Sequence, residues 1–511
     1  MVYIHGGGYF AGSSSKYPPY ALMNEDIVMV VIQYRLGVLG FLSTEDEIIP
    51  GNFGLKDQTE ALRWVSRNIR HFGGDPESVT LFGESAGAAS VHYQILTPKS
   101  DGLFVRAILQ SGSAMCPWSL GAAHRQVAQH TSKLFNCPTH SSQEILECLQ
   151  SAPGDKLVQA ILEYFEWLML PLVFGPRVDG DYLPAEPDEM MRAGTHKKMD
   201  VISGITSHEG GLHCLLLYSK EEVRRALVED FSSVGPVAMD FGSRDQSPLP
   251  SARTIFNYYL GDAQVNVANA DSVVKMFTDR HFAHCHDLQS IYFARNSDTH
   301  RVFRYELEYR GQRSATELFD LGNIAQNWVT HVDDLFYLFT GRDIWLPLTK
   351  PSDLKLRNIF TKMWTNFAAT GNPTPDESLG FTWESSTEEN FHYLSLSPSP
   401  EMKPDNRKEV RQFFATLPTR QNRILGSGKH PDEGTYLSSA EILIRSGRAI
   451  REFFLTLPTH QNEILEDDSS PPELLTQPPS SGAPSSFETE DTLDIEPKTH
   501  LKPRKLPREE L

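Results

Sequence analysis

The sequence of 511 residues lacks any run of about 18 apolar residues free of charges, so we expect no membrane-spanning helix. Its most apolar stretch, residues 27–42, is interrupted by Gln33, Arg35 and two glycines. The N-terminus, MVYIHGGGYF, also lacks the basic residues and the cleavable apolar segment of a secretory signal. By this interpretation the chain opens inside a core strand.

Cysteine is scarce. The five residues include no CxxC pair, which argues against a disulfide-dense scaffold and against a zinc site with paired spacing. Cys137 and Cys148 are close enough in the sequence to close a small loop. Unpaired cysteines usually behave as small apolar residues, so we expect Cys116, Cys214 and Cys285 to be buried free thiols.

Basic residues are also fewer than acidic ones: the sequence has 47 Lys and Arg residues and 66 Asp and Glu residues, which gives a formal net charge of −19. Nucleic acids and anionic membrane surfaces would repel such a protein, so neither is an expected partner. The simplest interpretation of the excess carboxylates is that they keep the protein in solution. The sequence does not determine the oligomeric state.

Up to about residue 205, short apolar runs alternate with longer amphipathic stretches, which is typical of a sheet with crossover helices. Residues 56–72 have the spacing of an amphipathic helix, with Leu62, Val65 and Ile69 on one face. We therefore predict an α/β fold with a mostly parallel central sheet flanked by helices. The strand candidates are residues 2–5, 27–34, 79–82, 107–110 and 200–204, followed by a strand at 301–305 and a helix at 353–369.

The C-terminal part of the sequence differs in organisation from the rest. The segment RQFFATLPTRQNRIL from Arg411 recurs as REFFLTLPTHQNEIL from Arg451, and a single pair of copies is too few for a solenoid. The following chain is rich in proline and charge and has little to bury, so we expect disorder there. The predicted organisation is one α/β domain at residues 1–424, a duplicated segment at 425–465 and a disordered tail at 466–511.

The segment VTLFGESAGAASVHYQIL is the most informative in the chain. A short β run leads into Gly-Glu-Ser-Ala-Gly and then into a helical pattern, which is the arrangement of a nucleophile elbow around Ser85. The turn is so tight that side chains at positions 83 and 87 would collide with the neighbouring strand and helix. A surface loop serine is the alternative interpretation, and the small residues after Ser85 argue against it.

Acyl transfer places negative charge on the carbonyl oxygen, so a nucleophilic serine needs N–H donors nearby. Three consecutive glycines in HGGGYF follow a predicted strand and can turn their N–H groups toward a ligand. We assign Gly7, Gly8 and Ala86 as the expected oxyanion donors. A flexible glycine turn is the alternative.

In these motifs the sequence resembles the type-B carboxylesterases, the α/β-hydrolase family that includes the cholinesterases and many arthropod esterases. The shared landmarks, in family order, are HGGGYF, NFGLKDQTEALRWVSRNIRHFGGDPESVTLFGESAG, ILQSGSAMCPW and WTNFAATGNPTP. The resemblance continues to about Ile424 and implies that the family's N-terminal strands are missing here. It also implies a buried ion pair between Arg35 and Asp57, a disulfide between Cys137 and Cys148, and supporting roles behind the triad for Glu84 and Ser111.

In this fold the acid and the histidine follow the serine in that order. Glu209 in DVISGITSHEGG is similar to the family's acid, with Asp179 and Asp181 as rivals. His331 in NWVTHVDDLFYLF is similar to the family's histidine, although Val332 occupies a place where glycine is usual and could shift the imidazole. The rivals His281, His284 and His286 also invite a metal-site interpretation, which the spacing of His284 and His286 disfavours because helical residues two apart do not face each other.

We therefore predict a serine carboxylic ester hydrolase that uses Ser85, Glu209 and His331 through an acyl-enzyme and needs no metal or cofactor. Trp118, Leu170 and Leu172 resemble acyl-pocket residues, and the aliphatic pair suggests a broad range of small-molecule carboxylic esters. A catalytically silent scaffold or adhesion homologue is the alternative, and an interfacial lipase would need an apolar lid that the sequence does not reveal. The resemblance implies a secreted or ER-lumenal protein, and residues 508–511, REEL, faintly resemble an ER-retrieval signal.

Overall fold

The structure, a computed structural model, describes residues 1–426 except 243–244, 296–298, 320 and 342–344. The described residues fall within one compact unit, Met1–Leu455. The second copy of the duplicated segment and the predicted tail at 466–511 lie outside the described residues. Within the described part, no helix combines the length and the apolarity that a membrane crossing requires.

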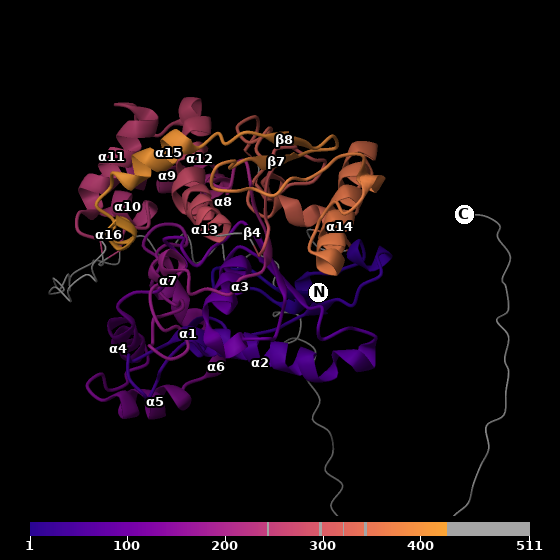
Figure 1. Cartoon of the computed structure of the whole chain (residues 1–511). Helices are drawn as coiled ribbons and strands as arrows, with labels where there is room; N and C mark the ends of the chain where they lie inside the picture. Colours follow the sequence, from indigo (N-terminus) through magenta and orange to yellow (C-terminus); the bar gives the residue numbers. More distant parts are fainter. Residues whose placement is uncertain (243–244, 296–298, 320, 342–344, 427–511) are drawn as a thin grey trace, which may run out of the picture. The chain divides into compact units, whose positions relative to one another are not determined.

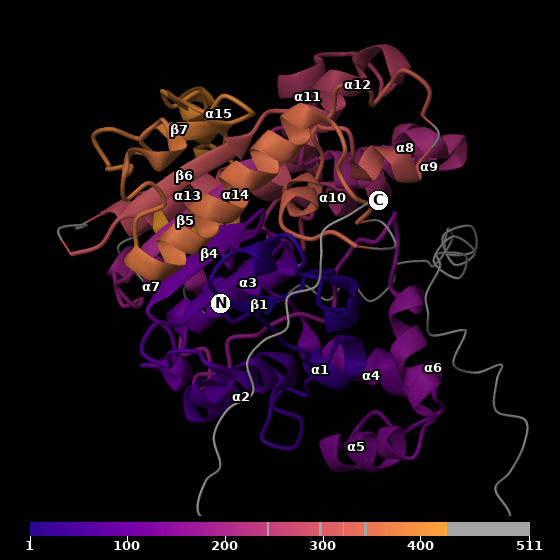
Figure 2. The same cartoon turned by 90° about the vertical axis from the view of Figure 1, so that its right-hand side faces the viewer.

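An eight-stranded sheet forms the centre of the described structure, in the order β2-β1-β3-β4-β5-β6-β7-β8. All neighbouring pairs are parallel except β7 and β8, which confirms the predicted mostly parallel sheet. Figure 2 shows β1, β4, β5, β6 and β7 side by side, with α14 in front of them. The strands are β1 (Val2–Ile4), β2 (Val30–Val31), β3 (Thr80–Glu84), β4 (Arg106–Gln110), β5 (Asp200–Thr206), β6 (Val302–Leu307), β7 (Tyr393–Leu396) and β8 (Glu401–Lys403).

Both faces of the sheet are covered, because successive side chains of a strand point to opposite sides. In β1, Val2 and Ile4 pack in one core cluster with residues of α2 (Phe53–Asn68) and α3 (Ala86–Leu96). Tyr3, between them, packs in another cluster with residues of α14 (Pro351–Thr370). The continuous apolar runs of these strands therefore reflect burial on two sides, as is usual in parallel sheets.

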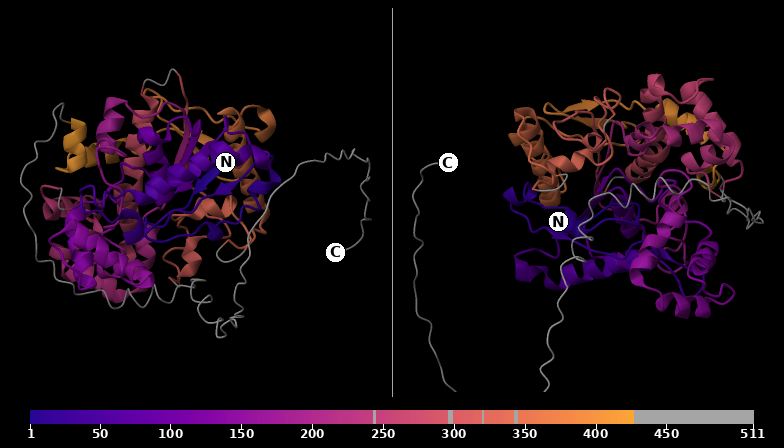
Figure 3. Two further views of the ribbon diagram at one scale, coloured as in Figure 1. Left: turned by 90° about the horizontal axis from the view of Figure 1, so that it is seen from below. Right: turned by 180° about the vertical axis from the view of Figure 1, so that it is seen from behind.

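Several of the remaining helices follow one another without a strand between them, α4 to α7 between β4 and β5 and α8 to α13 between β5 and β6. A third core cluster joins α8 to α12 with α15. Figure 1 shows this group together, away from α14, and the right-hand view of Figure 3 shows it from behind. The helices are α1 (Gly37–Phe41), α4 (His124–Leu134), α5 (Ser142–Gln150), α6 (Gly154–Gln159), α7 (Pro187–Ala193), α8 (Gly211–Ser219), α9 (Glu221–Glu229), α10 (Phe231–Ala238), α11 (Pro248–Leu260), α12 (Ala270–Thr278), α13 (His284–Ala294), α15 (Lys408–Ala415) and α16 (Arg420–Gly426).

The cysteines correct one prediction. Cys137 and Cys148 form the expected disulfide, but Cys116 and Cys285 are also bonded, with a Cα–Cα distance of 4.9 Å, and are not free thiols. Only Cys214 is free and buried among the described cysteines. The two partners are separated by 169 residues in the sequence, and only the packing of the segment after β4 against α13 brings them together.

The ion pair between Arg35 and Asp57 forms, but the prediction that it is buried is wrong. Arg35 Nη2 lies 2.7 Å from Asp57 Oδ1, and the two side chains are 51% and 26% exposed. The pair follows β2, the outermost strand of the described sheet, and the guanidinium packs over the ring of Phe53. The pair therefore lies at the edge of the fold, where water screens it.

A buried network of ion pairs lies instead around Asp287 on α13. This carboxylate is fully buried and forms ion pairs with Arg304, Arg407 and Arg411, at 2.6 Å, 3.0 Å and 2.7 Å. Arg304 and Arg407 are themselves almost fully buried, so Asp287 compensates charges that water does not reach. Asp287 thereby ties α15 and the segment before it to β6 and α13.

We expect Asp287→Asn to destabilise the protein by about 3–5 kcal/mol, because removing one partner of a buried ion pair leaves the others uncompensated. The measurement is the urea midpoint of unfolding, followed by circular dichroism. Asp57→Asn removes an exposed partner and should change the free energy of unfolding by at most about 1 kcal/mol. Equal effects of the two substitutions would contradict the assignment of Asp287 as a buried organising charge.

Candidate functional site

Ser85 lies at a tight turn between β3 and α3. Its backbone has φ 58° and ψ −127°, a conformation rarely adopted by residues other than glycine. A Cβ at Gly87 would lie 2.0 Å from the carbonyl oxygen of Ile4, and one at Gly83 would lie 2.6 Å from the backbone of Gly87. The two glycines are therefore required by the close approach of β1, β3 and α3, as the sequence pattern indicated.

The glycine loop after β1 lies beside this turn. Gly7 and Gly8 have φ of 109° and 60°, and a Cβ at Gly7 would lie 2.2 Å from the carbonyl oxygen of Ala11. Among the described residues, no backbone carbonyl accepts the N–H of Gly7 or Gly8. Ala86 is the first residue of α3, where N–H groups lack partners within the helix and the helix dipole is positive. This end of the sheet therefore offers N–H donors to an anionic oxygen.

Glu209 follows β5 and is fully buried. Its Oε1 accepts the Thr206 backbone N–H at 2.7 Å and the hydroxyl of Ser111. Its Oε2 lies 2.6 Å from Nδ1 of His331. Two hydrogen bonds thus hold Oε1 of the carboxylate in place, while Oε2 faces the imidazole.

His331 lies between two carboxylates. Its Nδ1 contacts Glu209, and its Nε2 lies 3.0 Å from Oε1 of Glu84, the residue immediately before Ser85. The described residues include no hydrogen bond between His331 and the Ser85 hydroxyl, although both side chains line one cavity. Such bonds are often long in unliganded enzymes and tighten when substrate binds. Val332 adopts the left-handed conformation of a glycine, with φ 72°, and His331 still reaches Glu209.

Burial and mutual charge set the protonation of this group. Burial raises the pKa of Glu84 to about 8, against the opposing effect of the His331 charge. Burial alone would lower the pKa of His331, but the carboxylates of Glu84 and Glu209 outweigh it and raise that pKa to about 9. A second buried acid, Asp334, also has a raised pKa through burial and accepts from Gln110 and Tyr305. Glu84 and His331 interact directly and therefore titrate as a pair.

The rival acids lie elsewhere. Asp179 accepts from Asn52 and from the backbone N–H groups of Tyr182 and Leu183, and Asp181 is exposed and pairs with Lys99. Neither forms a hydrogen bond or ion pair with a histidine among the described residues.

The rival histidines belong to other interactions. His284 stacks on Phe414 and His286 contacts Asp287, whereas His281 lines the cavity. No group of three His, Cys, Asp or Glu side chains in the described part of the chain is arranged to hold a metal ion.

The cavity has a volume of about 280 Å³ and brings several predicted site residues together. Predicted residues that line it are Gly7, Gly8, Glu84, Ser85, Trp118, Leu170, Leu172 and His331. Other residues that line the cavity were not predicted as cavity residues from the sequence: Gly6, Phe10, Ala11, Gly12, Tyr17, Met169, Leu212, His213, His281 and Phe282. Val332 lines the cavity as well. Two segments singled out in the sequence contain part of this set: HGGGYF contains Gly6 and Phe10, and FTDRHFAHCHDL contains His281 and Phe282.

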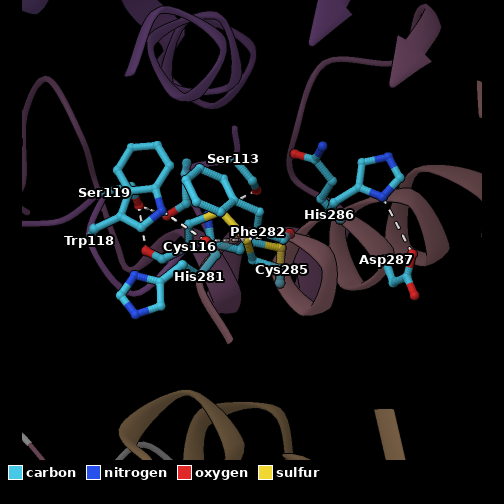
Figure 4. The surroundings of a disulfide bond; sticks show 12 residues. Ser113, Cys116, Trp118, Ser119, His281, Phe282, Cys285, His286 and Asp287 are labelled. Atoms are coloured by element: carbon cyan, nitrogen blue, oxygen red, sulfur yellow. Dashed lines mark hydrogen bonds and ion pairs between the residues drawn. A yellow bond between two sulfur atoms is a disulfide. The ribbon is translucent and has the colours of Figure 1, made fainter. Parts of the chain in front are cut away.

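The unexpected disulfide lies behind one wall of the cavity. Cys116 is two residues before Trp118, and Cys285 is three residues after Phe282, so the bond joins the two segments that carry this wall. The indole Nε1 of Trp118 also donates to the carbonyl oxygen of His281 at 2.8 Å. Figure 4 shows Trp118, His281 and Phe282 around this bond. The wall is therefore fixed covalently and by a hydrogen bond.

Comparisons with known proteins identify the family of the chain. Residues 1–414 match the Carboxylesterase family. Venom carboxylesterase-6 of Apis mellifera is 33% identical over 437 residues, which cover 83% of this chain and 77% of that protein. Esterase FE4 of Myzus persicae is 36% identical, covering 74% of this chain and 68% of that protein, and juvenile hormone esterase of Tribolium castaneum is 34% identical, covering 75% and 68%.

Proposed function

The chain belongs to the carboxylesterase family and is a carboxylic ester hydrolase, and from this premise we propose that Ser85, His331 and Glu209 are its catalytic triad. The observation that carries the proposal is the 2.6 Å contact of Glu209 with His331, at a cavity that Ser85 and the glycine loop also line. Four segments far apart in the sequence supply these groups, each immediately after a strand or in a loop at the same end of the sheet.

In the proposed reaction the Ser85 hydroxyl attacks the ester carbonyl while Nε2 of His331 takes its proton. The N–H groups of Gly7, Gly8 and Ala86 stabilise the oxyanion, and His331 returns the proton to the leaving alcohol. Water, activated by the same imidazole, then hydrolyses the acyl-enzyme and regenerates Ser85. Glu209 orients the imidazole and stabilises its positive charge without taking the proton. Glu84 acts on His331 through its contact with Nε2, and Ser111 donates a hydrogen bond to Glu209.

The walls of the cavity favour apolar esters. Trp118, Leu170 and Leu172 line it together with Met169 and Phe282, and its volume of about 280 Å³ suits a small or medium acyl group. We propose a broad range of carboxylic ester substrates, with residues 1–424 as the catalytic domain. The two disulfides are consistent with an oxidising compartment, so we propose that the protein enters the secretory pathway.

A fluorophosphonate probe tests the proposed nucleophile, because it phosphonylates an activated serine and leaves ordinary serines unmodified. We expect one labelled peptide, covering VTLFGESAGAAS, with the label on Ser85. A folded protein that stays unlabelled would contradict the proposal and favour the silent scaffold. Label on another serine would place the active site elsewhere.

The pair of Glu84 and His331 predicts a specific pH dependence. Only the neutral imidazole can accept the serine proton, so kcat/KM should rise with pH through the ionisation of this pair, whose pKa values are about 8 and about 9. Glu84→Gln removes the negative charge that holds the proton on His331. We therefore expect the midpoint of the kcat/KM profile to move to lower pH by about one unit or more.

The control for this shift is Asp57→Asn, which removes a carboxylate that pairs with Arg35 at the sheet edge. It should leave the midpoint in place. A Glu84→Gln profile that superimposes on that of the unmodified protein would show that Glu84 does not set the protonation of the base.

A further inference from the structure

One polar residue of the cavity wall, His213, is unusual because it is buried without hydrogen-bond partners. His213, on α8 one turn after Glu209, lines the cavity and is 3% exposed. Among the described residues, neither of its ring nitrogens has a hydrogen-bond partner, and its Nδ1 is fully enclosed. A buried polar group without a partner is unfavourable and calls for an explanation.

The neighbours of His213 provide no hydrogen-bond partner for its ring nitrogens. Its ring lies against Phe277, at a centroid distance of 5.4 Å, and against His281, at 4.6 Å with a tilt of 60°. His281 donates from Nε2 to the carbonyl oxygen of Ala238 at 3.0 Å, which leaves only an acceptor at its Nδ1, also without a partner. Two adjacent imidazoles in this wall thus have unused hydrogen-bonding capacity.

The imidazole of His213 is neutral, because burial and then the positive charge of His331 lower its pKa to about 3. A neutral imidazole offers one donor and one acceptor. The cavity lining contains no lysine or arginine among the described residues, so an anionic group beside His213 would find no ammonium or guanidinium partner. This environment can therefore bind a neutral oxygen of a ligand.

The position of His213 assigns it to the side of the cavity proposed to hold the acyl group. It touches His281, whose carbonyl oxygen accepts the indole N–H of Trp118, so the three residues form one wall. His281 lies in a π-helical turn, η7 (Asp279–Ala283), and such turns are frequent at functional sites. The disulfide of Cys116 and Cys285 fixes the segments that carry Trp118 and His281, so the wall is pre-organised for recognition.

We infer that His213 is a specificity residue that recognises a neutral hydrogen-bonding oxygen in the acyl group of the substrate. The preferred esters then carry an ether, keto or hydroxyl oxygen in place of one methylene of a simple aliphatic chain. The remaining walls, formed by Trp118, Leu170, Leu172 and Phe282, hold the carbon atoms on either side. This inference rests on the proposed function of Ser85.

Three matched pairs of para-nitrophenyl esters test it: butanoate with methoxyacetate, pentanoate with methoxypropanoate, and hexanoate with methoxybutanoate, each ether terminal in a straight chain. Within a pair, one ether oxygen replaces one methylene, at a different distance from the carbonyl in each pair. Each kcat/KM is divided by the rate constant for hydroxide-catalysed hydrolysis of the same ester, which removes the inductive effect of the oxygen. We expect a preference for the ether ester of about tenfold or more in at least one pair.

His213→Phe keeps a ring of similar size and removes both nitrogens. The ether preference should disappear, because kcat/KM for the ether ester should fall more than kcat/KM for the all-carbon ester of that pair. His284→Phe is the matched control, because His284 is also buried, has a pKa lowered by burial to about 4, and is not among the residues of the cavity. It should leave the ether preference unchanged.

The outcomes separate the two proposals. If the all-carbon esters are hydrolysed but no pair shows an ether preference, the inference on His213 fails and the proposed function stands. An equal loss on both members of every pair in His213→Phe would assign the residue a structural role and also overturn the inference. Failure of the unmodified protein to hydrolyse any of the six esters, or hydrolysis independent of Ser85, would overturn the proposed function itself.

Discussion

Ser85→Ala is expected to lower kcat for para-nitrophenyl butanoate by about 10⁴- to 10⁶-fold, because the acyl-enzyme can no longer form. KM should change little, since the cavity walls and the glycine loop remain. The residual rate comes from the oxyanion donors and from binding alone. The measurement is steady-state kinetics at high enzyme concentration, with circular dichroism to verify the fold.

Ser90→Ala is the matched control for this substitution. Ser90 lies on the same helix, α3, is fully buried and accepts a hydrogen bond from Gln58, and it is not among the residues of the cavity. Its loss should leave kcat within about tenfold. If Ser85→Ala kept more than a small fraction of the activity, the nucleophile would have to be sought elsewhere.

The second large effect is expected from Glu209→Gln, with kcat reduced by about 10³- to 10⁴-fold. The environment of the carboxylate determines which way the new amide faces. Because the Thr206 N–H donates to Oε1, the amide oxygen must take that position, and the NH₂ group then faces Nδ1 of His331. Nδ1 is forced to accept, the proton moves to Nε2, and the imidazole can no longer take the serine proton.

Two companion variants distinguish this effect from a general loss of structure. Glu209→Asp keeps a carboxylate and should retain more activity than Glu209→Gln, although its shorter side chain weakens the contact with His331. Asp181→Asn removes a rival acid that pairs with Lys99 at the surface and should leave kcat unchanged. If Glu209→Gln and Asp181→Asn behaved alike, Glu209 would not be the acid of the triad.

The protonation of His331 shows how far the sequence could lead. The order of the triad and the resemblance to the family's histidine loop predicted His331, and the structure places its imidazole against Glu209 despite Val332. No local pattern indicates that Glu84 contacts the other ring nitrogen, because that contact joins two residues 247 positions apart, 84 and 331. The pH dependence predicted above therefore rests on the structure alone.

Local patterns in the sequence determined the parallel sheet and the sharp turn at Ser85, because these depend on residues that are close together along the chain. The alternation of strands and helices and the spacing of Gly83 and Gly87 are constraints of this kind. The disulfide between Cys137 and Cys148 was expected from the family resemblance, and its two cysteines are only 11 residues apart.

Tertiary packing decided what depends on burial and on pairing between distant segments. It joined Cys116 to Cys285 across 169 residues, left the ion pair of Arg35 at the sheet edge, and placed His213 without a partner in the cavity wall. A sequence specifies the polarity of a side chain, but whether that side chain meets water, a partner or neither follows only from the segments that pack against it.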